Sequence, residues 1–211
     1  MMNLLDPLRT ATRWFTPVVV IAALAIGGCS PSEAREAVGA ESAAAGTIDS
    51  ILPVEEALRR FQADLPPVTE LSGGAESREA LVRRFLHAVE VRDTAALRSL
   101  VLARAEFGWL YYPGSAFARE PYYQMPQLNW FLNVEDSQKG ITRVVTRYGG
   151  TDLRSADYHC PNPERVDRQF TFWDRCIVAF EHEGVAKRMR LFGSIVELNG
   201  HFKFYSYAND L

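Results

Sequence analysis

Three cysteines are the residues most capable of covalent chemistry, and the first of them has a distinctive setting. Cys29 follows two glycines at the end of an apolar run, Val18–Ile26, and both Arg9 and Arg13 precede that run. A basic start, a short apolar run and small residues before a cleavage point are typical of a secretory signal peptide. The run has about nine residues, whereas a membrane-spanning helix needs about 20. We therefore expect residues 1–28 to be a signal peptide rather than a membrane anchor.

The sequence Ile26-Gly27-Gly28-Cys29 also resembles a bacterial lipobox, in which the cysteine is acylated and becomes the new N-terminus. The resemblance implies an exported protein whose membrane partner is reached through an N-terminal lipid. Each buried CH₂ of an acyl chain contributes about 0.8 kcal/mol, so several chains hold a protein firmly. Ser30 rather than Asp follows the cysteine, which favours the periplasmic face of the outer membrane in a host with two membranes. The alternative is an ordinary signal peptide with an incidental cysteine.

Acylation of Cys29 would leave Cys160 and Cys176 as the one intramolecular pair of thiols. Disulfides persist in exported proteins. A bond between these two would close a loop of about 17 residues and contribute roughly 3 kcal/mol in the chain-entropy model. The alternative is two reduced, buried thiols. Two cysteines at this spacing are not a structural zinc site, which needs four ligands at short paired spacings. We predict a disulfide.

Asp174 is the one residue that we single out as a catalytic candidate. It interrupts an apolar strand pattern opposite Gly193, and a carboxyl group in an apolar cavity has a raised pKa and can act as a general acid or base. Tyrosines near the mouth of such a cavity could complete the site: Tyr111, Tyr112, Tyr122 and Tyr123. The alternatives for Asp174 are a hydrogen bond to Ser206, an ion pair with an arginine, or a bulge that turns the carboxylate outward.

Other sequence patterns for catalysis and metal binding are missing. The four histidines show neither a helical i, i+4 pair nor the carboxylate pattern of a metal site: His87, His159, His182 and His201. No glycine-rich phosphate loop leads into a helix, and no Gly-x-Ser-x-Gly nucleophile elbow occurs. We therefore expect no metal and no cofactor.

Aromatic residues suggest a binding pocket. Trp109, Tyr111, Trp130 and Asp174 are the predicted lining, because small-molecule sites are mostly apolar with a few polar groups. The alternative is that aromatics at this density belong to the hydrophobic core.

One face of the predicted sheet is a candidate interface. It carries aromatic and arginine side chains with little lysine, a composition typical of protein interfaces: Trp173, Arg175, Phe192, Tyr205 and Tyr207. Arginine over aromatic rings also adds cation–π attraction. This face predicts a homodimer or a contact with an envelope protein. The alternative is that residues 51–65 or 113–133 cover it. The net charge of −3 excludes nucleic acid as a partner, since a basic surface is absent.

The chain divides into segments that would position these residues. Residues 29–50 are rich in Ala, Ser, Glu and Gly without an apolar period, and predict a flexible tether with a reach of about 25 Å. Residues 51–76 predict a short helix, within 51–65, followed by a linker. Residues 77–211 predict one α+β domain.

The first half of that domain predicts helices. Ser77 would cap a helix over residues 77–91, and Asp93 would cap a second one. Three further elements are expected: an aromatic strand or extended segment at 109–113, and helices near 127–133 and at 140–148, the last ending at Gly149.

After Gly150 the apolar residues alternate, which predicts antiparallel sheet. Asn199-Gly200 and Glu183-Gly184 are the expected hairpin turns. They fix a register in which Phe172 faces Ile195 and Val178 faces Met189. One face then collects the apolar residues: Phe170, Phe172, Cys176, Val178, Phe180, Met189, Leu191, Ile195, Phe202 and Phe204. A one-residue slip would move a strand's whole apolar set to the other face.

The helical segment ALVRRFLHAVEVRDTAALRSLVL, residues 80–102, followed by a long antiparallel sheet resembles the nuclear-transport-factor-2-like superfamily, the cystatin-like α+β cone. The resemblance would cover about residues 77–210. It implies helices packed on a curved antiparallel sheet around an apolar pocket. The superfamily includes ketosteroid isomerase and scytalone dehydratase as well as binding proteins, so the fold does not decide the function. Residues 113–133 are longer and more aromatic than the family pattern.

These observations support two main hypotheses. The first is a lipid-anchored envelope protein whose domain binds a ligand or a protein without catalysis. The alternative is a cone-fold isomerase or dehydratase that uses Asp174 with a tyrosine. A structural scaffold in a larger assembly is a third reading.

Overall fold

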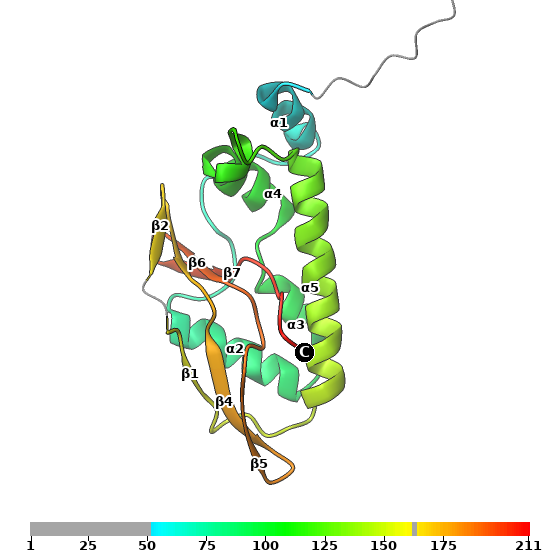
Figure 1. The fold of residues 1–211 in the computed structure, drawn as a ribbon, viewed down its shortest axis with the longest axis vertical. Coiled ribbons are helices and arrows are strands. Elements are labelled where there is room, and N and C mark those ends of the chain that lie inside the picture. Colours follow the sequence, from blue (N-terminus) through cyan, green and yellow to red (C-terminus); the bar gives the residue numbers. More distant parts are fainter. Residues whose placement is uncertain (1–51, 162–163) are drawn as a thin grey trace, which may run out of the picture. The chain divides into compact units, whose positions relative to one another are not determined.

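A computed structural model describes residues 52–161 and 164–211 of the chain (Figure 1). Cys29, the predicted signal peptide and the predicted tether lie outside the described residues. The described residues form one unit, in which helices accompany two antiparallel sheets. The predicted α+β class is confirmed.

Three helices follow the predicted boundaries closely. They are α1 (Val54–Gln62), α2 (Arg78–Glu90) and α3 (Thr94–Ser99). The Ser77 hydroxyl accepts a hydrogen bond from the Ala80 N–H at 3.1 Å, and the Asp93 carboxylate accepts one from the Ala96 N–H at 2.9 Å. Each side chain thus satisfies a backbone donor that a helix start leaves unpaired.

The predicted strand at 109–113 is wrong, because the chain stays helical there. The short helix α4 (Arg104–Glu106) continues into the π-helix η1 (Phe107–Tyr111), and two 3₁₀ turns follow, η2 (Tyr112–Gly114) and η3 (Ala116–Ala118). The Tyr112 N–H donates to the Phe107 carbonyl, the i to i+5 pattern of a π-helix. This wider turn lets Phe107, Tyr111 and Tyr112 all point into a hydrophobic core.

Residues 126–148 form one long helix, α5 (Pro126–Tyr148), where we predicted two. The sequence suggested a break because the buried face of this helix is polar in its middle, with Asn129, Asn133 and Ser137 all more than nine-tenths buried. A search for apolar periodicity does not detect such a face.

The polar face of α5 binds the backbone of the C-terminal segment. The Asn133 amide donates to the Tyr205 carbonyl at 3.0 Å, and the Ser137 hydroxyl accepts from the Tyr207 N–H at 3.2 Å. Gly140 lets this segment approach closely, since a Cβ there would lie 1.8 Å from the Tyr207 carbonyl oxygen. The Gly140 carbonyl in turn accepts from the Asn209 amide at 3.0 Å.

The strands form two sheets. One has the order β1-β4-β5 and the other β2-β3-β6-β7, all antiparallel. Their bounds are β1 Asp157–His159, β2 Arg165–Asp167, β3 Phe170–Trp173, β4 Ile177–His182, β5 Val185–Met189, β6 Ile195–Leu198 and β7 His201–Phe204.

Both predicted hairpin turns are confirmed. Val178 pairs with Met189, and Ile195 pairs with Phe204, as the turns required. Glu183-Gly184 and Asn199-Gly200 all have positive φ, between 52° and 80°. A two-residue type I′ turn needs positive φ at both positions, which Asn-Gly supplies at low cost.

The register between β3 and β6 differs from the prediction by one residue. Phe172 pairs with Val196 and not with Ile195. The expected long strand breaks between Trp173 and Ile177, where Arg175 has a φ of +56°. A left-handed residue inside an extended segment offsets the pairing of β3, before it, from that of β4, after it. The predicted single apolar face is therefore wrong.

The strands β3, β6 and β7 lie between two hydrophobic cores, whereas β2 at the sheet edge is largely exposed. The first core packs α2, α3 and α5 on the sheets and includes Phe85, Leu97, Val144, Cys176, Val178, Leu191, Phe192, Ile195, Phe204 and Tyr207. The second core includes Phe61, Leu71, Leu102, Phe107, Tyr111, Tyr112, Phe170, Phe172, Val196 and Leu198. Strand side chains alternate between faces, so neighbours such as Ile195 and Val196 belong to different cores.

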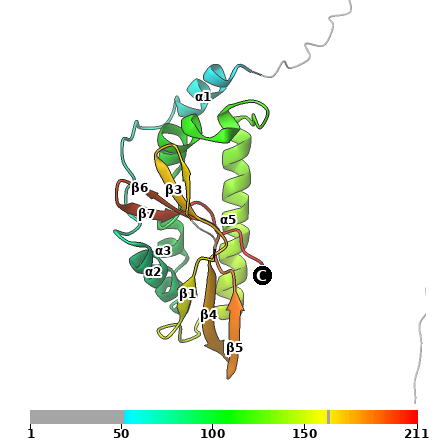
Figure 2. The ribbon, with the colours of Figure 1, turned by 60° about the vertical axis from the view of Figure 1, so that its left-hand side comes forward.

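The two cores occupy opposite ends of the unit (Figures 1 and 2). In both views α1 and the start of α5 lie at one end, and the β4–β5 hairpin lies at the other. In the first core, the Phe85 ring lies 5.2 Å from Phe192, 5.5 Å from Phe204 and 5.5 Å from Tyr207, centroid to centroid. These fully buried rings fill the space between helix and sheet where the cone resemblance implied a pocket.

An ion pair is buried beside the second core. Lys203 and Glu106 have side chains only 3% and 2% exposed, with Nζ 2.8 Å from Oε2. The Glu106 carboxylate also accepts from the backbone N–H groups of Ser72 and Ala103, each at 2.7 Å. Lys203 Nζ donates to the Ser72 carbonyl at 2.9 Å as well. The pair ties β7, the start of α4 and the linker before α2 together.

Candidate functional site

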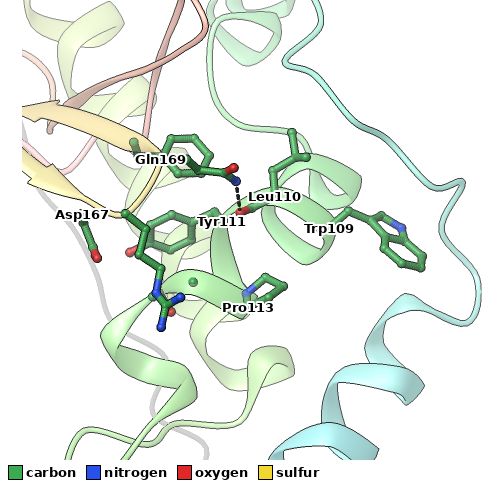
Figure 3. Close-up of a pocket in the computed structure, with 10 residues that line it drawn as sticks. Trp109, Leu110, Tyr111, Pro113, Asp167 and Gln169 are labelled. Carbon is green, nitrogen blue, oxygen red and sulfur yellow. Dashed lines mark hydrogen bonds between the residues drawn. The ribbon is translucent and has the colours of Figure 1, made fainter.

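A pocket of about 330 Å³ lies between the π-helix and the β2–β3 turn (Figure 3). Its lining comes from two chain segments. One spans η1, η2 and the next residue: Trp109, Leu110, Tyr111, Pro113, Gly114 and Ser115. The other runs from the end of β2 through the turn into β3: Asp167, Arg168, Gln169 and Phe170. We call it the η1 pocket. Its irregular helical wall is of note, since π-helical turns occur frequently at functional sites.

Local geometry holds the two walls together. The Gln169 amide donates to the Leu110 carbonyl at 3.0 Å, the contact drawn in Figure 3. Arg168 takes a left-handed conformation, φ +54°, which makes the β2–β3 turn tight. The Arg168 stem packs against Gly114, where a Cβ would lie 3.0 Å from Arg168 Cδ. The turn is thus fixed against the helical wall at two points.

Tyr111 forms the apolar wall of the pocket. Its ring lies 4.9 Å from that of Tyr205 and 5.8 Å from that of Phe170, centroid to centroid. Burial raises the pKa of Tyr111 well above its usual value of 10, and the nearby Tyr205 and Asp167 raise it further. Tyr111 therefore stays protonated at neutral pH and can donate or accept a hydrogen bond but cannot serve as an anion.

The polar groups of the η1 pocket are of kinds that ligand sites use. Asp167 supplies a carboxylate, Arg168 a guanidinium and Gln169 an amide, all from one turn. An apolar wall with a few converging polar groups is the usual make-up of a ligand site. The arrangement suits a ligand or peptide segment with an apolar group and a hydrogen-bonding or charged group beside it.

The structure brings two of the four predicted pocket residues together. Trp109 and Tyr111 both line the η1 pocket, although the Trp109 indole points away from Asp167 (Figure 3). Trp130 packs on Phe107 in the second core, with ring centroids 5.3 Å apart, and borders a separate groove beside α5. Asp174 is not among the residues that line the η1 pocket.

Among the lining residues that the sequence analysis missed are the three that supply the polar side chains of one wall: Asp167, Arg168 and Gln169. They precede β3 in a segment without clear alternation, and their only signal is a charged turn directly before Phe170. Nothing in the spacing relates that turn to residues 109–115, which lie more than 50 positions earlier.

Asp174 lies at the break between β3 and β4 and is held by polar partners. Its carboxylate accepts from the Ser194 hydroxyl at 2.5 Å and from Arg165 Nε at 3.4 Å. The Arg165 guanidinium also lies 4.1 Å above the Phe172 ring. Of the alternatives for Asp174, the ion pair with an arginine is the one observed, and the serine is Ser194 rather than Ser206.

The tyrosines expected beside Asp174 lie elsewhere. The Tyr112 hydroxyl donates to the Gln124 carbonyl at 2.8 Å, and the Tyr123 hydroxyl to the Leu52 carbonyl at 3.2 Å. Tyr122 is exposed, and Tyr111 lines the η1 pocket. The described contacts thus do not assemble a carboxylate–tyrosine pair around Asp174.

The predicted interface residues do not share one exposed face. Phe192 and Tyr207 are fully buried in the first core, and the partly buried Tyr205 packs against the second. Trp173 is half-buried beneath the Arg78 guanidinium, 4.6 Å from the ring centroid, while Arg175 is exposed. The strand break at Arg175 scatters them. Of the five, only Tyr205 packs against the second core, whereas Trp173, Phe192 and Tyr207 pack in or against the first.

The predicted disulfide between Cys160 and Cys176 is confirmed, with sulfur atoms 2.03 Å apart. It joins the segment after β1 to the segment before β4.

Among the described residues, no group of three His, Cys, Asp or Glu side chains could hold a metal ion. None of the helices within 52–161 and 164–211 is long and apolar enough to cross a membrane.

No protein-family model matches the chain. No curated protein and no solved structure matches it either.

Proposed function

We propose that this chain is an exported envelope lipoprotein, anchored by an acyl-modified Cys29, whose α+β domain binds a ligand or a protein segment in the η1 pocket without catalysis. The proposal retains the outer membrane as the favoured location in a host with two membranes. It also retains membership of the cone-like superfamily, in a form whose interior is filled by aromatic rings.

The observation that carries the export proposal is the Cys160–Cys176 disulfide. Structural disulfides form and persist in oxidising compartments and are rare in the cytosol. The bond also accounts for two of the three cysteines, so that Cys29 is the third, placed directly after an apolar run. A sequence motif and a structural feature more than 130 residues apart thus support the same compartment.

The filled first core supports binding over catalysis. Enzymes of the cone type would need a cavity between helix and sheet, and here Phe85, Phe192 and Tyr207 occupy that space. The η1 pocket is instead at the surface, between a π-helix and a turn, with polar groups fixed by the scaffold. Its size, about 330 Å³, is at the lower end for small-molecule sites and also suits a side chain of a protein partner.

The export proposal is tested by expressing the full chain in a bacterium with two membranes and measuring the mass of the purified protein. We expect loss of residues 1–28 and addition of acyl chains at Cys29, with the protein in the outer-membrane fraction. The matched control is Cys29→Ala, which should remain unacylated. A soluble, unacylated wild-type chain would overturn the anchor.

The binding site is tested with a photo-reactive amino acid placed at Leu110, beside the pocket, in intact cells. Expected is a discrete crosslinked product that Arg168→Ala and Gln169→Ala weaken severalfold. The control is the same probe at Val185, an exposed residue of β5. Equal crosslinking at both positions would contradict a site at the η1 pocket.

A further inference from the structure

The outward face of α5 is unexpectedly apolar at its start. Five large apolar side chains within 11 residues are exposed: Tyr122 68%, Met125 40%, Leu128 44%, Phe131 57% and Leu132 45%. We call these five residues the apolar patch. Single exposed apolar residues are ordinary, but a contiguous group marks an interaction surface.

The same helix face changes character further along. Positions 128 and 132 continue at helical spacing to Glu135 and Lys139, which form an ion pair at 3.3 Å, and then to the exposed Thr142 and Arg143. The face opposite, with Asn133 and Ser137, is buried. The apolar exposure is therefore confined to the first two to three turns of α5, and the rest of that face has the usual solvated composition.

The patch lies where the N-terminal part of the chain enters the described unit. The Tyr123 hydroxyl, between Tyr122 and Met125, donates to the Leu52 carbonyl at 3.2 Å. The Gln127 amide, in the first turn of α5, donates to the Ala57 carbonyl of α1 at 3.3 Å. Figures 1 and 2 both show α1 beside the start of α5. Leu52 is 23 positions after Cys29, the residue that carries the lipid in the proposed function.

We propose that the apolar patch rests in the headgroup region of the membrane to which Cys29 is anchored, and so orients the domain on the lipid surface. This inference rests on the proposed function. The tether predicted from the sequence for residues 29–50 would have a typical reach of about 25 Å. Such a tether would leave Leu52 and the adjoining patch near the anchored lipid. Apolar and aromatic side chains on one helix face are what interfacial contact with lipid requires.

The position of the patch favours lipid over a second copy of the chain. A protein interface could lie anywhere on the surface, whereas a membrane contact is favoured near the first described residues, where Tyr123, beside the patch, bonds Leu52. Tyr122 adds an amphipathic ring of the kind enriched at the membrane–water boundary. The charged continuation at Lys139 and Arg143 would remain in water above the lipid surface.

The test uses the full chain in vesicles of phosphatidylethanolamine and phosphatidylglycerol that contain a nitroxide-labelled lipid. A fluorophore is attached through Leu132→Cys in the patch. The matched controls are Arg143→Cys, three turns further along α5, and Val185→Cys, an exposed apolar position at the far end of the unit. We expect severalfold stronger quenching by the nitroxide lipid at position 132 than at either control, and loss of that difference when Leu128 and Phe131 are also changed to Ser.

Mass measurement of the same samples separates this inference from the proposed function. An acylated chain with equal quenching at all three positions would overturn the membrane contact and leave the lipoprotein proposal intact. An unacylated chain that is still quenched only at position 132 would support the contact and refute the anchor. A chain without acylation or quenching would overturn both. A chain that forms a dimer at tens of micromolar, without lipid quenching at position 132, would identify a second copy and overturn the contact.

Discussion

The two hydrophobic cores are built from different kinds of elements and contacts. The first is built from regular elements, with amphipathic α2 and α3 against alternating strands, and a disulfide closes it. The second surrounds a π-helix, two 3₁₀ turns and the buried Glu106–Lys203 pair. The η1 pocket belongs to the second. Regular packing leaves no room at the first core's centre, while the irregular backbone of the second leaves a concave surface at its edge.

The two cores should therefore be destabilised by different kinds of substitution. The second core depends on electrostatic partners that must all be present, because a buried charge without its partner is costly. The first depends on apolar volume and on a covalent link. Variants that loosen one core and spare the other can therefore confirm or refute this difference between the cores.

Removal of one partner of the buried ion pair should have the largest effect. Lys203→Ala leaves the Glu106 carboxylate buried without its cation, and we expect a loss of about 3–5 kcal/mol in the free energy of unfolding. Denaturant unfolding measures the loss, and hydrogen exchange should show residues 107–112 loosened before α2. The control is Lys139→Ala, whose exposed pair with Glu135 should contribute less than about 1 kcal/mol. A loss no larger than that of the control would refute the dependence of the second core on the pair.

Loss of the disulfide should affect the first core. The double variant Cys160→Ala with Cys176→Ala removes a link across 16 positions, and we expect a loss of roughly 3 kcal/mol. The expected hydrogen-exchange change is at β1 and β4 rather than at η1. Reductant should destabilise the wild-type chain by a similar amount and leave the double variant unchanged. Equal loosening of both cores would show that they unfold as one.

A methyl group at Gly140 tests the contact between α5 and the C-terminal segment. Alanine is normally favoured over glycine within a helix by about 1 kcal/mol. Here its Cβ would lie 1.8 Å from the Tyr207 carbonyl oxygen, so we expect Gly140→Ala to destabilise by about 1–3 kcal/mol instead. Thr142→Ala, at an exposed position of the same helix, is the control and should be neutral or slightly stabilising. A stabilising Gly140→Ala would contradict the close approach.

Alkaline pH should lower the stability of the whole domain gradually. Burial raises the pKa of Tyr111, Tyr112 and Tyr205 in the second core, and of Tyr207 in the first, above the usual value of 10. Above pH 10 the unfolded chain has lost these protons while the folded chain keeps them, so the free energy of unfolding falls as pH rises. The slope should be up to about 1.4 kcal/mol per pH unit for each such tyrosine. Tyr111→Phe should reduce the slope measured by urea unfolding between pH 10 and 11; an unchanged slope would show that Tyr111 does not contribute.

Tyr158 packs against the first core, and its ionisation can be followed in the same pH titration. Burial raises its pKa to about 12, with a further contribution from Glu79, whose carboxylate accepts from the Tyr158 hydroxyl at 3.2 Å. Absorbance of the phenolate should therefore show Tyr158 ionising near that pH, below the tyrosines of the second core whose pKa values are raised further. Ionisation of Tyr111 before Tyr158 would reverse the expected order.

The sequence predicted the regular half of the fold because local rules decide it. The Ser77 and Asp93 caps, both hairpin turns and the disulfide each depend on a few adjacent residues or on a residue type with one preferred role. The elements of the second core depend on tertiary contacts. A π-helix and an aromatic strand have similar compositions over 107–112, and nothing local distinguishes them.

Two further misses have definite physical causes. The register slip at Phe172 arises from a single left-handed residue, Arg175, where alternation looked unbroken. The false division of α5 arises because its buried face binds backbone atoms rather than apolar side chains. The sequence indicated only the helical wall of the η1 pocket, because that wall is aromatic. The polar turn at Asp167–Gln169 comes to lie beside the wall only when the strands pair.

The polar face of α5 has a consequence for the order in which the domain can be completed. Asn133 and Ser137 bond the backbone of Tyr205 and Tyr207, and the Gly140 carbonyl accepts from the Asn209 side chain. Tyr207 also adds a buried ring to the first core. These contacts close the unit with its last residues, so they can form only after Tyr205, Tyr207 and Asn209 have been synthesised. A chain that ends before Tyr205 would leave Asn133 and Ser137 without these partners and the first core without the Tyr207 ring.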